Sequence, residues 1–217
     1  MKPAYRQRTW AFTLIELLVT IAVFALIIVI ILPGIHEPNR STRSRWHCTN
    51  NLRQIGVAFR AWALDNNDRF PMQVTLTNSS TFELLYGNEA YVHFQAMSNE
   101  LSTPKFLICP SDREKTWATN FTTDFSNQKV SYFVGLDASA ETPNSFLSGD
   151  RNLTNALGIK GGILTLITNL PVSWTEGVHV KLENICLADG SVLQLTSHGL
   201  QNVHVNSGLA TNRLAMP

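Results

Sequence analysis

The chain has 217 residues, and its 17 Lys and Arg nearly balance its 16 Asp and Glu, which gives a formal net charge of +1. Only 15% of the residues are charged, whereas a nucleic-acid-binding surface needs a concentrated basic face, so we expect no nucleic-acid partner. About 150 residues follow the N-terminal helical part, which is enough for one compact core but not comfortably for two.

The first predicted element is an apolar run at residues 12–32, preceded by a short basic leader. A helix of these 21 residues, at about 1.5 Å per residue, just crosses a hydrocarbon core of about 30 Å. The run therefore predicts a membrane-spanning helix. A cleaved secretory signal is the alternative, but no small-x-small cleavage site follows the run. Basic residues stand on both sides of it, so charge does not settle the orientation.

Glu16 stands near the start of this apolar run. An ionised side chain at the centre of a membrane span costs about 2.5 to 3.5 kcal/mol, and less near an end. We therefore expect Glu16 either to pair with an opposite charge or to have a function. In a plain membrane anchor the side chain would instead reach out to water, because it lies only a turn from the interface.

Residues 11–16 read AFTLIE, and this string after a basic leader resembles the class III signal of type IV prepilins and type II secretion pseudopilins. The resemblance implies that a prepilin peptidase cuts before Phe12 and methylates the new amino terminus. Ala11 stands where the family usually has Gly. Glu16 becomes the fifth residue of the processed chain, and its carboxylate would pair with the amine of a neighbouring subunit during assembly. Pro33 falls where pilins often carry a helix-kinking proline.

A second, amphipathic helix is predicted from about residue 42 to residue 64. Proline removes a backbone donor and clashes with the preceding turn, so Pro33 and Pro38 predict a bend or break before it. Apolar positions at helical spacing lay one stripe along this helix; they are Leu52, Ile55, Phe59 and Trp62. Its arginines would meet lipid head groups or acidic neighbours in a filament, or form a solvated face; they are Arg40, Arg43, Arg45, Arg53 and Arg60.

Residues 65–71 read DNNDRFP, a group of turn formers closed by a proline that ends the helix. Residues 64–71 also resemble the segment after the long helix of the major pseudopilin of type II secretion. Oxygen-rich turns sometimes bind calcium, but this one lacks the alternating ligand spacing and the closing glutamate of a calcium loop. We therefore expect no metal here.

The C-terminal part is predicted to be an α+β head, with helix first and sheet later. A short helix is expected at residues 92–101. Residues 137–155 are rich in Ser, Asn, Gly and Pro and predict a long surface excursion. Strands are expected at 106–108, 129–136, 163–168, 178–182, 185–188 and 191–195.

His179 is followed by nine residues and then by Asp189-Gly190. This pattern resembles the C-terminal signature of a group of prepilin-like proteins with an otherwise uncharacterised head, and matching segments lie at residues 48–56, 67–71 and 109–112. Asp-Gly between two β-rich runs is a strong signal for a two-residue hairpin turn in which both residues take positive φ. We therefore interpret the signature as structural, with His179 bonded to the hairpin or to Asp189.

The functional alternative makes His179 and Asp189 metal ligands or an acid–base pair. That alternative needs a third ligand or a nucleophile. His198 and His204 are candidates only because they lie nearby in the sequence.

The chain has three cysteines, Cys48, Cys109 and Cys186. Cys48 and Cys109 belong to segments that resemble the prepilin-like group, so the resemblance implies a disulfide between them that staples head to helix in an oxidising space. Cys186 lies in an apolar run, where a buried free thiol acts as a small hydrophobic side chain. Three free thiols are the alternative. A catalytic Cys186 with His179 and Asp189 is a further one, although the spacing does not demand it.

The resemblance implies an α+β, pilin-like fold, with a long N-terminal membrane-spanning α-helix packed against a C-terminal antiparallel β-sheet head. The leader peptide would be residues 1–11, the transmembrane half of the long helix 12–35, its amphipathic half 36–65 and the globular head 66–217.

The implied function is that of a structural subunit of a type IV pilus-like or type II secretion pseudopilus filament, without enzyme activity, cofactor or metal. Its partners would be other pilin-like subunits, the prepilin peptidase, an inner-membrane assembly platform and membrane lipid. It would cross the bacterial inner membrane once, with its head on the periplasmic or extracellular side, or stand in a filament there. The alternatives are a membrane-anchored exported binding protein that does not polymerise, and a membrane-tethered hydrolase.

Overall fold

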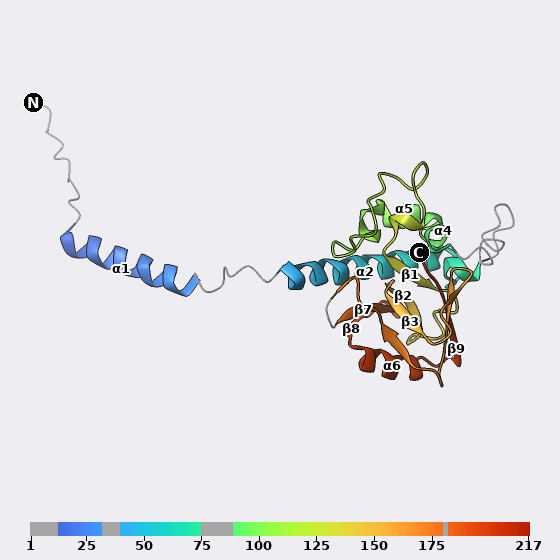
Figure 1. Cartoon of the computed structure of the whole chain (residues 1–217). Helices are drawn as coiled ribbons and strands as arrows, with labels where there is room; N and C mark the ends of the chain where they lie inside the picture. The colour runs from blue at the N-terminus through green and yellow to red at the C-terminus, as the bar shows by residue number, and fades with distance from the viewer. Residues whose placement is uncertain (1–12, 32–39, 75–88, 180–181) are drawn as a thin grey trace, which may run out of the picture. The chain divides into compact units, whose positions relative to one another are not determined.

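The computed structural model describes residues 13–31, 40–74, 89–179 and 182–217 (Figure 1). The chain divides into two compact units, Met1–Asn39 and Arg40–Pro217, and each is described by itself. The predicted leader, the predicted cleavage position and the predicted bend at Pro33 and Pro38 lie outside the described residues.

The first unit contains helix α1 (Leu14–Ile31), which has 18 residues. Thr13 begins it with a capping box, in which the first residue and the residue three positions later cap each other. The Thr13 backbone N–H donates to the Glu16 carboxylate at 2.9 Å, and the Glu16 backbone N–H donates to Thr13 Oγ1 at 3.3 Å. The side chains of residues 14–30 are all exposed, and nearly all are apolar.

The prediction of a long membrane-spanning N-terminal helix packed against the head is wrong. None of the described helices is both long enough and apolar enough to cross a membrane. The capping box starts α1 only at Leu14, and at about 1.5 Å per residue its length is about 27 Å. Helix α2 (Arg40–Asp65) is a separate element of the second unit. The fold that the structure has is α+β with a large antiparallel sheet.

Helix α2 carries the predicted apolar stripe on its buried face. Leu52, Ile55 and Phe59 are fully buried, and Trp62 is nearly so. These side chains pack against the sheet and against two short helices, α4 (Ala90–Ala96) and α5 (Ser98–Leu101). The helix that was predicted at residues 92–101 is therefore present but divided at Met97.

Seven antiparallel strands form the main sheet in the order β4-β5-β9-β1-β2-β7-β8. They are β1 (Tyr132–Gly135), β2 (Phe146–Asp150), β4 (Ile159–Lys160), β5 (Ile163–Ile167), β7 (Glu183–Leu187), β8 (Val192–Leu195) and β9 (Thr211–Ala215). A separate two-stranded sheet pairs β3 (Leu153–Asn155) with β6 (Val172–Trp174). The other helical segments are α6 (Ser197–Val205), η2 (Pro71–Gln73), η3 (Pro104–Leu107) and η4 (Asn127–Lys129).

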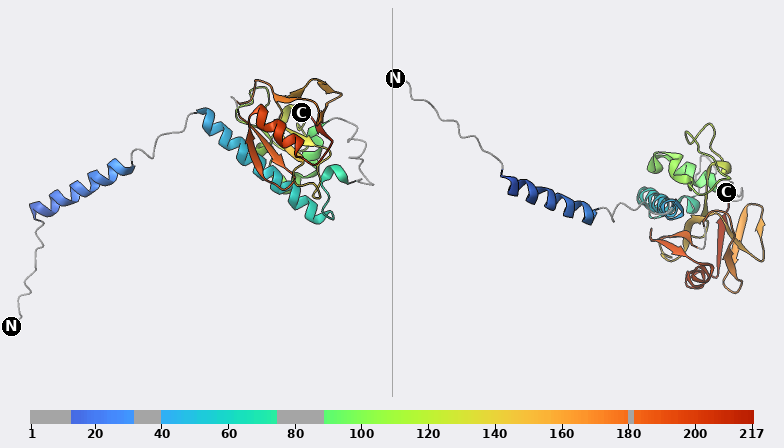
Figure 2. Two further views of the ribbon diagram at one scale, coloured as in Figure 1. Left: turned by 90° about the horizontal axis from the view of Figure 1, so that it is seen from below. Right: turned by 60° about the vertical axis from the view of Figure 1, so that its left-hand side comes forward.

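The second unit has three layers, because alternate residues of a strand face opposite sides of the sheet. Tyr132 and Val134 belong to the core beneath α2, whereas Phe133 between them belongs to the core beneath α6. In β7, Cys186 faces the α2 side and its neighbour Ile185 faces the α6 side. Figures 1 and 2 show α2, α4 and α5 on one face of the sheet and α6 on the other.

Most strands with an apolar pattern occur where they were predicted. The strands expected at 129–136, 163–168, 185–188 and 191–195 correspond to β1, β5, β7 and β8. Residues 106–108 do not form the expected strand, because Pro104 begins the short helix η3 there. Val178 and His179 lie in a bend rather than in a strand, and residues 180–181 lie outside the described residues.

The predicted surface excursion at 137–155 contains β2, which lies between β1 and β7 in the middle of the sheet. Its Ser-Gly-Asp sequence is typical of a turn, yet each of these residues fits a specific environment in the folded sheet. Ser148 Oγ donates to the Phe133 carbonyl at 2.7 Å. A Cβ on Gly149 would lie 2.7 Å from the Phe133 ring, and Asp150 is fully buried. These partners, rather than local propensity, place β2 inside.

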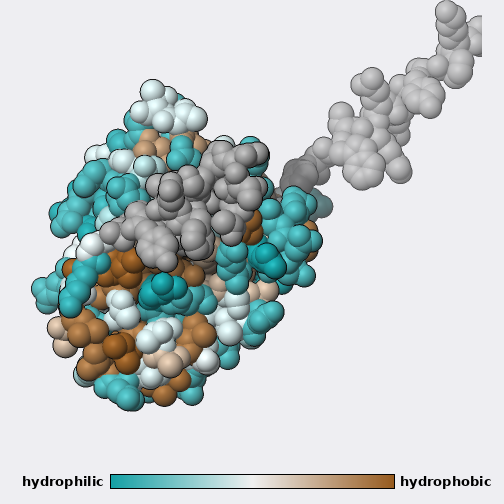
Figure 3. Space-filling model, turned by 90° about the vertical axis from the view of Figure 1, so that its right-hand side faces the viewer, coloured by the Kyte–Doolittle hydropathy of each residue, from teal (hydrophilic) through white to brown (hydrophobic). Residues whose placement is uncertain are grey.

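The surface of the head differs from that of α1. Figure 3 shows apolar side chains interspersed among hydrophilic ones on the face that it presents, outside the grey residues. Exposed large apolar residues of the second unit include Trp46, Val57 and Leu64, all three on α2.

Candidate functional site

The predicted processing residues, Ala11 and Phe12, lie outside the described residues. Glu16 lies in the first turn of α1. Besides the backbone N–H of Thr13, its carboxylate accepts a hydrogen bond from Thr13 Oγ1 at 2.8 Å. The carboxylate therefore has a role within its own chain, which is to begin the helix.

Cys48 and Cys109 are joined in a disulfide, with their Cα atoms 5.3 Å apart. Cys48 lies on α2, and Cys109 lies in the turn that follows η3. Both cysteines are fully buried. The bond therefore ties the main helix to a loop 61 residues further along the chain.

Asp189 and Gly190 lie in the turn between β7 and β8. Gly190 has a φ of +87°, but Asp189 is not among the described non-glycine residues with positive φ. The Leu187 carbonyl accepts from the Gly190 N–H, and the Leu187 N–H donates to the Ser191 carbonyl, both at 2.9 Å. The turn is therefore a three-residue hairpin loop that needs one left-handed residue, not the predicted two-residue turn.

His179 does not lie beside Asp189, because the length of β7 stands between them. The His179 backbone N–H donates to Glu183 Oε1, at the start of β7, at 3.0 Å. Its ring atom Nε2 lies 3.4 Å from the Sγ of Cys109 and 3.9 Å from Asp150 Oδ2. The structure thus brings His179 to the disulfide and to two carboxyl groups.

Asp150 and Glu183 form a buried carboxyl pair next to this ring. Asp150 is fully buried and Glu183 is 2% exposed. Burial, and next the charge of Glu183, raise the pKa of Asp150 well above its usual range. Burial also raises the pKa of Glu183. The pair therefore holds a proton more readily than solvent-exposed carboxyl groups do.

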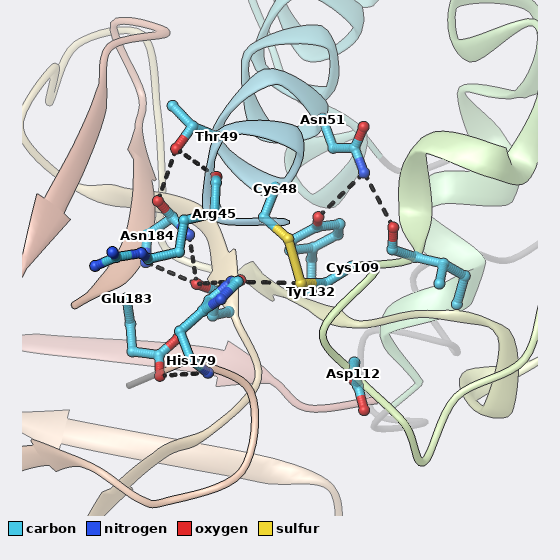
Figure 4. Close-up of a disulfide and its surroundings, with 12 residues drawn as sticks. Arg45, Cys48, Thr49, Asn51, Cys109, Asp112, Tyr132, His179, Glu183 and Asn184 are labelled. Atoms are coloured by element: carbon cyan, nitrogen blue, oxygen red, sulfur yellow. Dashed lines mark hydrogen bonds and ion pairs between the residues drawn. A yellow bond between two sulfur atoms is a disulfide. The ribbon is translucent and has the colours of Figure 1, made fainter. Parts of the chain in front are cut away.

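Neighbouring side chains hold the pair by hydrogen bonds, and Figure 4 shows two of these neighbours, Asn184 and Thr49, near Glu183. The backbone N–H and the side-chain amide of Asn184 both donate to Asp150 Oδ2, at 2.7 and 2.8 Å. Asn184 Oδ1 in turn accepts from the Thr49 hydroxyl on α2 at 2.9 Å. Asn152 Nδ2 donates to Glu183 Oε1 at 2.8 Å.

Burial lowers the pKa of His179 to about 4, and the nearby charge of Arg45 adds to this effect. The imidazole is therefore neutral at pH 7 and has a nitrogen lone pair available. Arg45 lies on α2 near His179 and Glu183 (Figure 4), and its positive charge favours the ionised form of Glu183.

The cluster opens on a cleft of 620 Å³ between β6 and the start of α6. His179 and Glu183 lie along one side of it, with the His179 side chain 1% exposed and Glu183 2% exposed. Its other lining residues are Trp174, Thr175, Glu176, Gly177, Val178 and Ser197.

The other sequence candidates are engaged elsewhere. Cys186 is buried, and burial raises the pKa of its thiol to about 12, so it is not a ready nucleophile. His204 is buried on α6 with its Nδ1 3.3 Å from Asn212 Nδ2. His198 lies on the exposed part of α6, near Asn202.

Asp150 and Glu183 are the site residues that sequence reasoning missed. Asp150 stands in the segment 137–155, whose composition predicts a surface excursion. Glu183 stands between the expected strands at 178–182 and 185–188, among the nine residues that separate His179 from Asp189 in the signature, none of which the signature specifies. The two acids meet because the end of β2 pairs with the start of β7, and no local pattern in the sequence indicates that pairing.

Comparison of the chain with protein-family models, with curated proteins and with solved structures finds no match. The fold and the site therefore define the protein as an α+β, disulfide-linked domain with a buried Asp-His-Glu cluster, preceded by a separate apolar helix.

Proposed function

We propose that the chain is a subunit of a type IV pilus-like or type II secretion pseudopilus filament. The observation that carries the proposal is α1, whose apolar side chains are exposed in the single chain, with Leu14 77% exposed and Val29 69% exposed. So large an apolar surface needs cover, since soluble monomers rarely expose more than a few hundred Å² in one patch. The α1 helices of neighbouring copies would supply that cover by packing together.

An exposed apolar line on α2 supports self-association of the second unit as well. Trp46, Val57 and Leu64 are 73%, 68% and 77% exposed. At about 100° per residue, their spacings place all three within about 20° of one another on the helix surface. This line would pack against a neighbouring copy.

Two further features support an exported subunit. The Cys48–Cys109 disulfide suits an oxidising compartment, which would be the periplasm or the cell exterior. Residues 11–16 carry the string that resembles a prepilin processing signal. The partners of the proposed subunit are other pilin-like subunits, a prepilin peptidase and an inner-membrane assembly platform.

Processing gives the first test. Co-expressed with a prepilin peptidase, the protein should lose residues 1–11 and gain a methyl group on Phe12, which intact-mass and peptide mass spectrometry would detect. An inactive peptidase is the control. An intact leader, or a cut beyond Leu32, would count against the proposal.

The capping box allows a sharper test of assembly through Glu16. Glu16→Gln keeps an acceptor for the Thr13 N–H but removes the charge, whereas Thr13→Ala keeps the charge and weakens the cap. If the carboxylate pairs with a neighbouring subunit's amine, Glu16→Gln abolishes filaments and Thr13→Ala leaves them. Filament yield by electron microscopy and cross-linking decides the result. Normal filaments from Glu16→Gln would show that assembly does not depend on charge pairing by Glu16.

The cleft beside His179 and Glu183 favours a second function, that of an exported binding protein that does not polymerise. Such a protein would stay monomeric when processed, and substitutions on the α2 line would leave its oligomeric state unchanged. Val57→Glu separates the two functions, because in a filament subunit it should weaken assembly. Sedimentation velocity of the processed chain reads out the difference.

A further inference from the structure

The Asp150, His179 and Glu183 side chains have the spacing of metal ligands. One donor atom from each lies within 4.8 Å of the other two, and the His179 Nε2 to Asp150 Oδ2 distance is 3.9 Å. Zinc bonds to nitrogen and carboxylate oxygen are about 2.0 to 2.2 Å long, so two such bonds span that distance. Side-chain shifts below about 1 Å bring all three donors onto one ion.

The two carboxyl groups each leave one buried oxygen without a hydrogen-bond donor. Within the described parts of the chain, no donor from outside the pair bonds to Asp150 Oδ1 or Glu183 Oε2, and the only hydrogen bond open to these oxygens is a proton shared between the two carboxyl groups. A buried carboxylate oxygen without a donor is costly. A cation between the two groups would supply the missing interaction.

The other oxygen of each carboxyl group is held by hydrogen bonds, as metal ligands usually are. Asn184 fixes Asp150 through Oδ2, and Asn152 with the His179 N–H fixes Glu183 through Oε1. These contacts orient both carboxyl groups before any ion binds, and the held Oδ2 is the Asp150 oxygen that lies 3.9 Å from His179 Nε2. The cleft lies along His179 and Glu183, so it is the side from which an ion would approach the three donors.

The donor set indicates which class of ion fits. Calcium takes six to eight oxygen ligands and magnesium keeps an octahedral oxygen shell, whereas one imidazole with two carboxylates suits zinc and similar transition metals. The ligands carry two negative charges when both carboxyl groups are ionised, and Arg45 nearby offsets part of them, which matches a divalent rather than a trivalent ion.

We propose that Asp150, His179 and Glu183 bind a zinc-like divalent metal ion at the head of the cleft. The site uses the three side chains with the Cys48–Cys109 disulfide intact. The ion links the end of β2 and the start of β7 to the bend at His179. This proposal does not depend on the filament function, because it concerns the second unit alone.

Zinc binding by the full-length chain tests the proposal. The chain, freed of metal by a chelator and kept non-reduced, is dialysed against Zn²⁺ and its zinc content is measured. One zinc per chain is expected, with affinity lowered about 100-fold or more by Asp150→Asn or Glu183→Gln. Each variant keeps the oxygen that accepts hydrogen bonds from its asparagine neighbour, and its new amide can donate to the remaining carboxyl group of the pair. Both variants should therefore fold, which circular dichroism and thermal melting check.

Two exposed residues supply matched controls. Asp189→Asn and His198→Gln remove one carboxylate and one imidazole outside the cluster, and both should bind zinc as the parent chain does. Equal zinc in the parent chain and in Asp150→Asn, or zinc lost only in His198→Gln, would overturn the proposal. A parent chain that takes up no zinc would also overturn the proposal, since a shared proton would then be all that links the two carboxyl groups.

Cobalt distinguishes this site from a thiolate site. Cys48, Cys109 and His179 also lie within 4.8 Å of one another, so a reduced chain could bind metal through sulfur. Co²⁺ in the non-reduced chain should show d–d bands without thiolate charge-transfer absorption. Binding that appears only after reduction, with that absorption, would contradict the assignment.

Discussion

Gly56 in the middle of α2 lies directly against Gly190 in the turn between β7 and β8. A Cβ on Gly56 would be 3.5 Å from Gly190 Cα and 2.9 Å from Cys186 Sγ, and a Cβ on Gly190 would be 3.3 Å from Arg60 Cδ. Arg60 Nη1 also donates to the Asp189 carbonyl at 3.1 Å. The Asp-Gly signature therefore forms part of the surface on which α2 rests.

Gly56→Ala should destabilise the protein. Alanine is favoured over glycine within a helix by about 1 kcal/mol, but the new methyl group is forced against a buried sulfur, and overpacking costs about 1 to 3 kcal/mol. We expect a net loss of up to about 2 kcal/mol in the free energy of unfolding, measured by urea denaturation. Val57→Ala on the exposed face of the same helix is the control and should change it by less than about 0.5 kcal/mol. A Gly56→Ala protein more stable than the parent would contradict the close contact.

The disulfide should contribute strongly to the stability of the head. A bond that closes a loop of 61 residues removes chain entropy worth about 4 kcal/mol in the unfolded state. Cys48→Ser with Cys109→Ser should therefore lower the free energy of unfolding by about that amount and abolish its dependence on reductant. Cys186→Ala is the control, and it should keep the full reductant dependence. Equal stability of the parent chain with and without reductant would contradict the prediction.

His93 should make the head lose stability in mild acid. It is 1% exposed on α4, and burial lowers its pKa from 6.5 to about 4. Because the unfolded chain then binds a proton more readily, stability is complete above pH 6.5 and falls by about 3 kcal/mol as the pH drops to 4. His93→Phe should lose correspondingly less over that interval. Denaturation curves at both pH values measure it, and equal losses in the two proteins would count against a neutral buried His93.

The ion pair between Asp112 and Arg151 should anchor the loop that carries Cys109. Arg151 Nε and Nη2 donate to the two Asp112 oxygens at 2.7 and 3.0 Å, and the Asp112 side chain is 1% exposed. Removing one partner of a buried pair costs about 3 kcal/mol or more, and Asp112→Asn should approach that loss. Glu114→Gln removes an exposed partner of the same arginine and should cost less than about 1 kcal/mol. Equal effects of the two substitutions in thermal melts would be inconsistent with this arrangement.

The elements that could be predicted are those whose apolar residues follow a period. The α2 stripe and the strands β1, β5, β7 and β8 have such a pattern, and each is present close to its predicted bounds. β2 could not be predicted this way, because Ser148, Gly149 and Asp150 favour turns when considered alone. Their places are decided by Phe133 and Asn184, which come from distant parts of the chain.

The candidate site shows the same limit. His179 could be singled out by its motif, but its neighbours Asp150 and Glu183 reach it only through the pairing of β2 with β7. The start of α1, in contrast, was open to prediction, since Thr13 and Glu16 have the spacing of a capping box. This spacing alone predicts the local role of Glu16.

The position of the disulfide has a mechanical consequence. Cys48 lies near the beginning of α2. Cys109 lies in the loop that also contains Asp112, and Asp112 forms an ion pair with Arg151, the residue directly after β2. A pulling force applied to the N-terminal end of α2 therefore reaches a covalent link before it reaches the packed stripe from Leu52 onward. The load is shared with the middle of the sheet, so the rest of α2 is protected from being peeled away turn by turn.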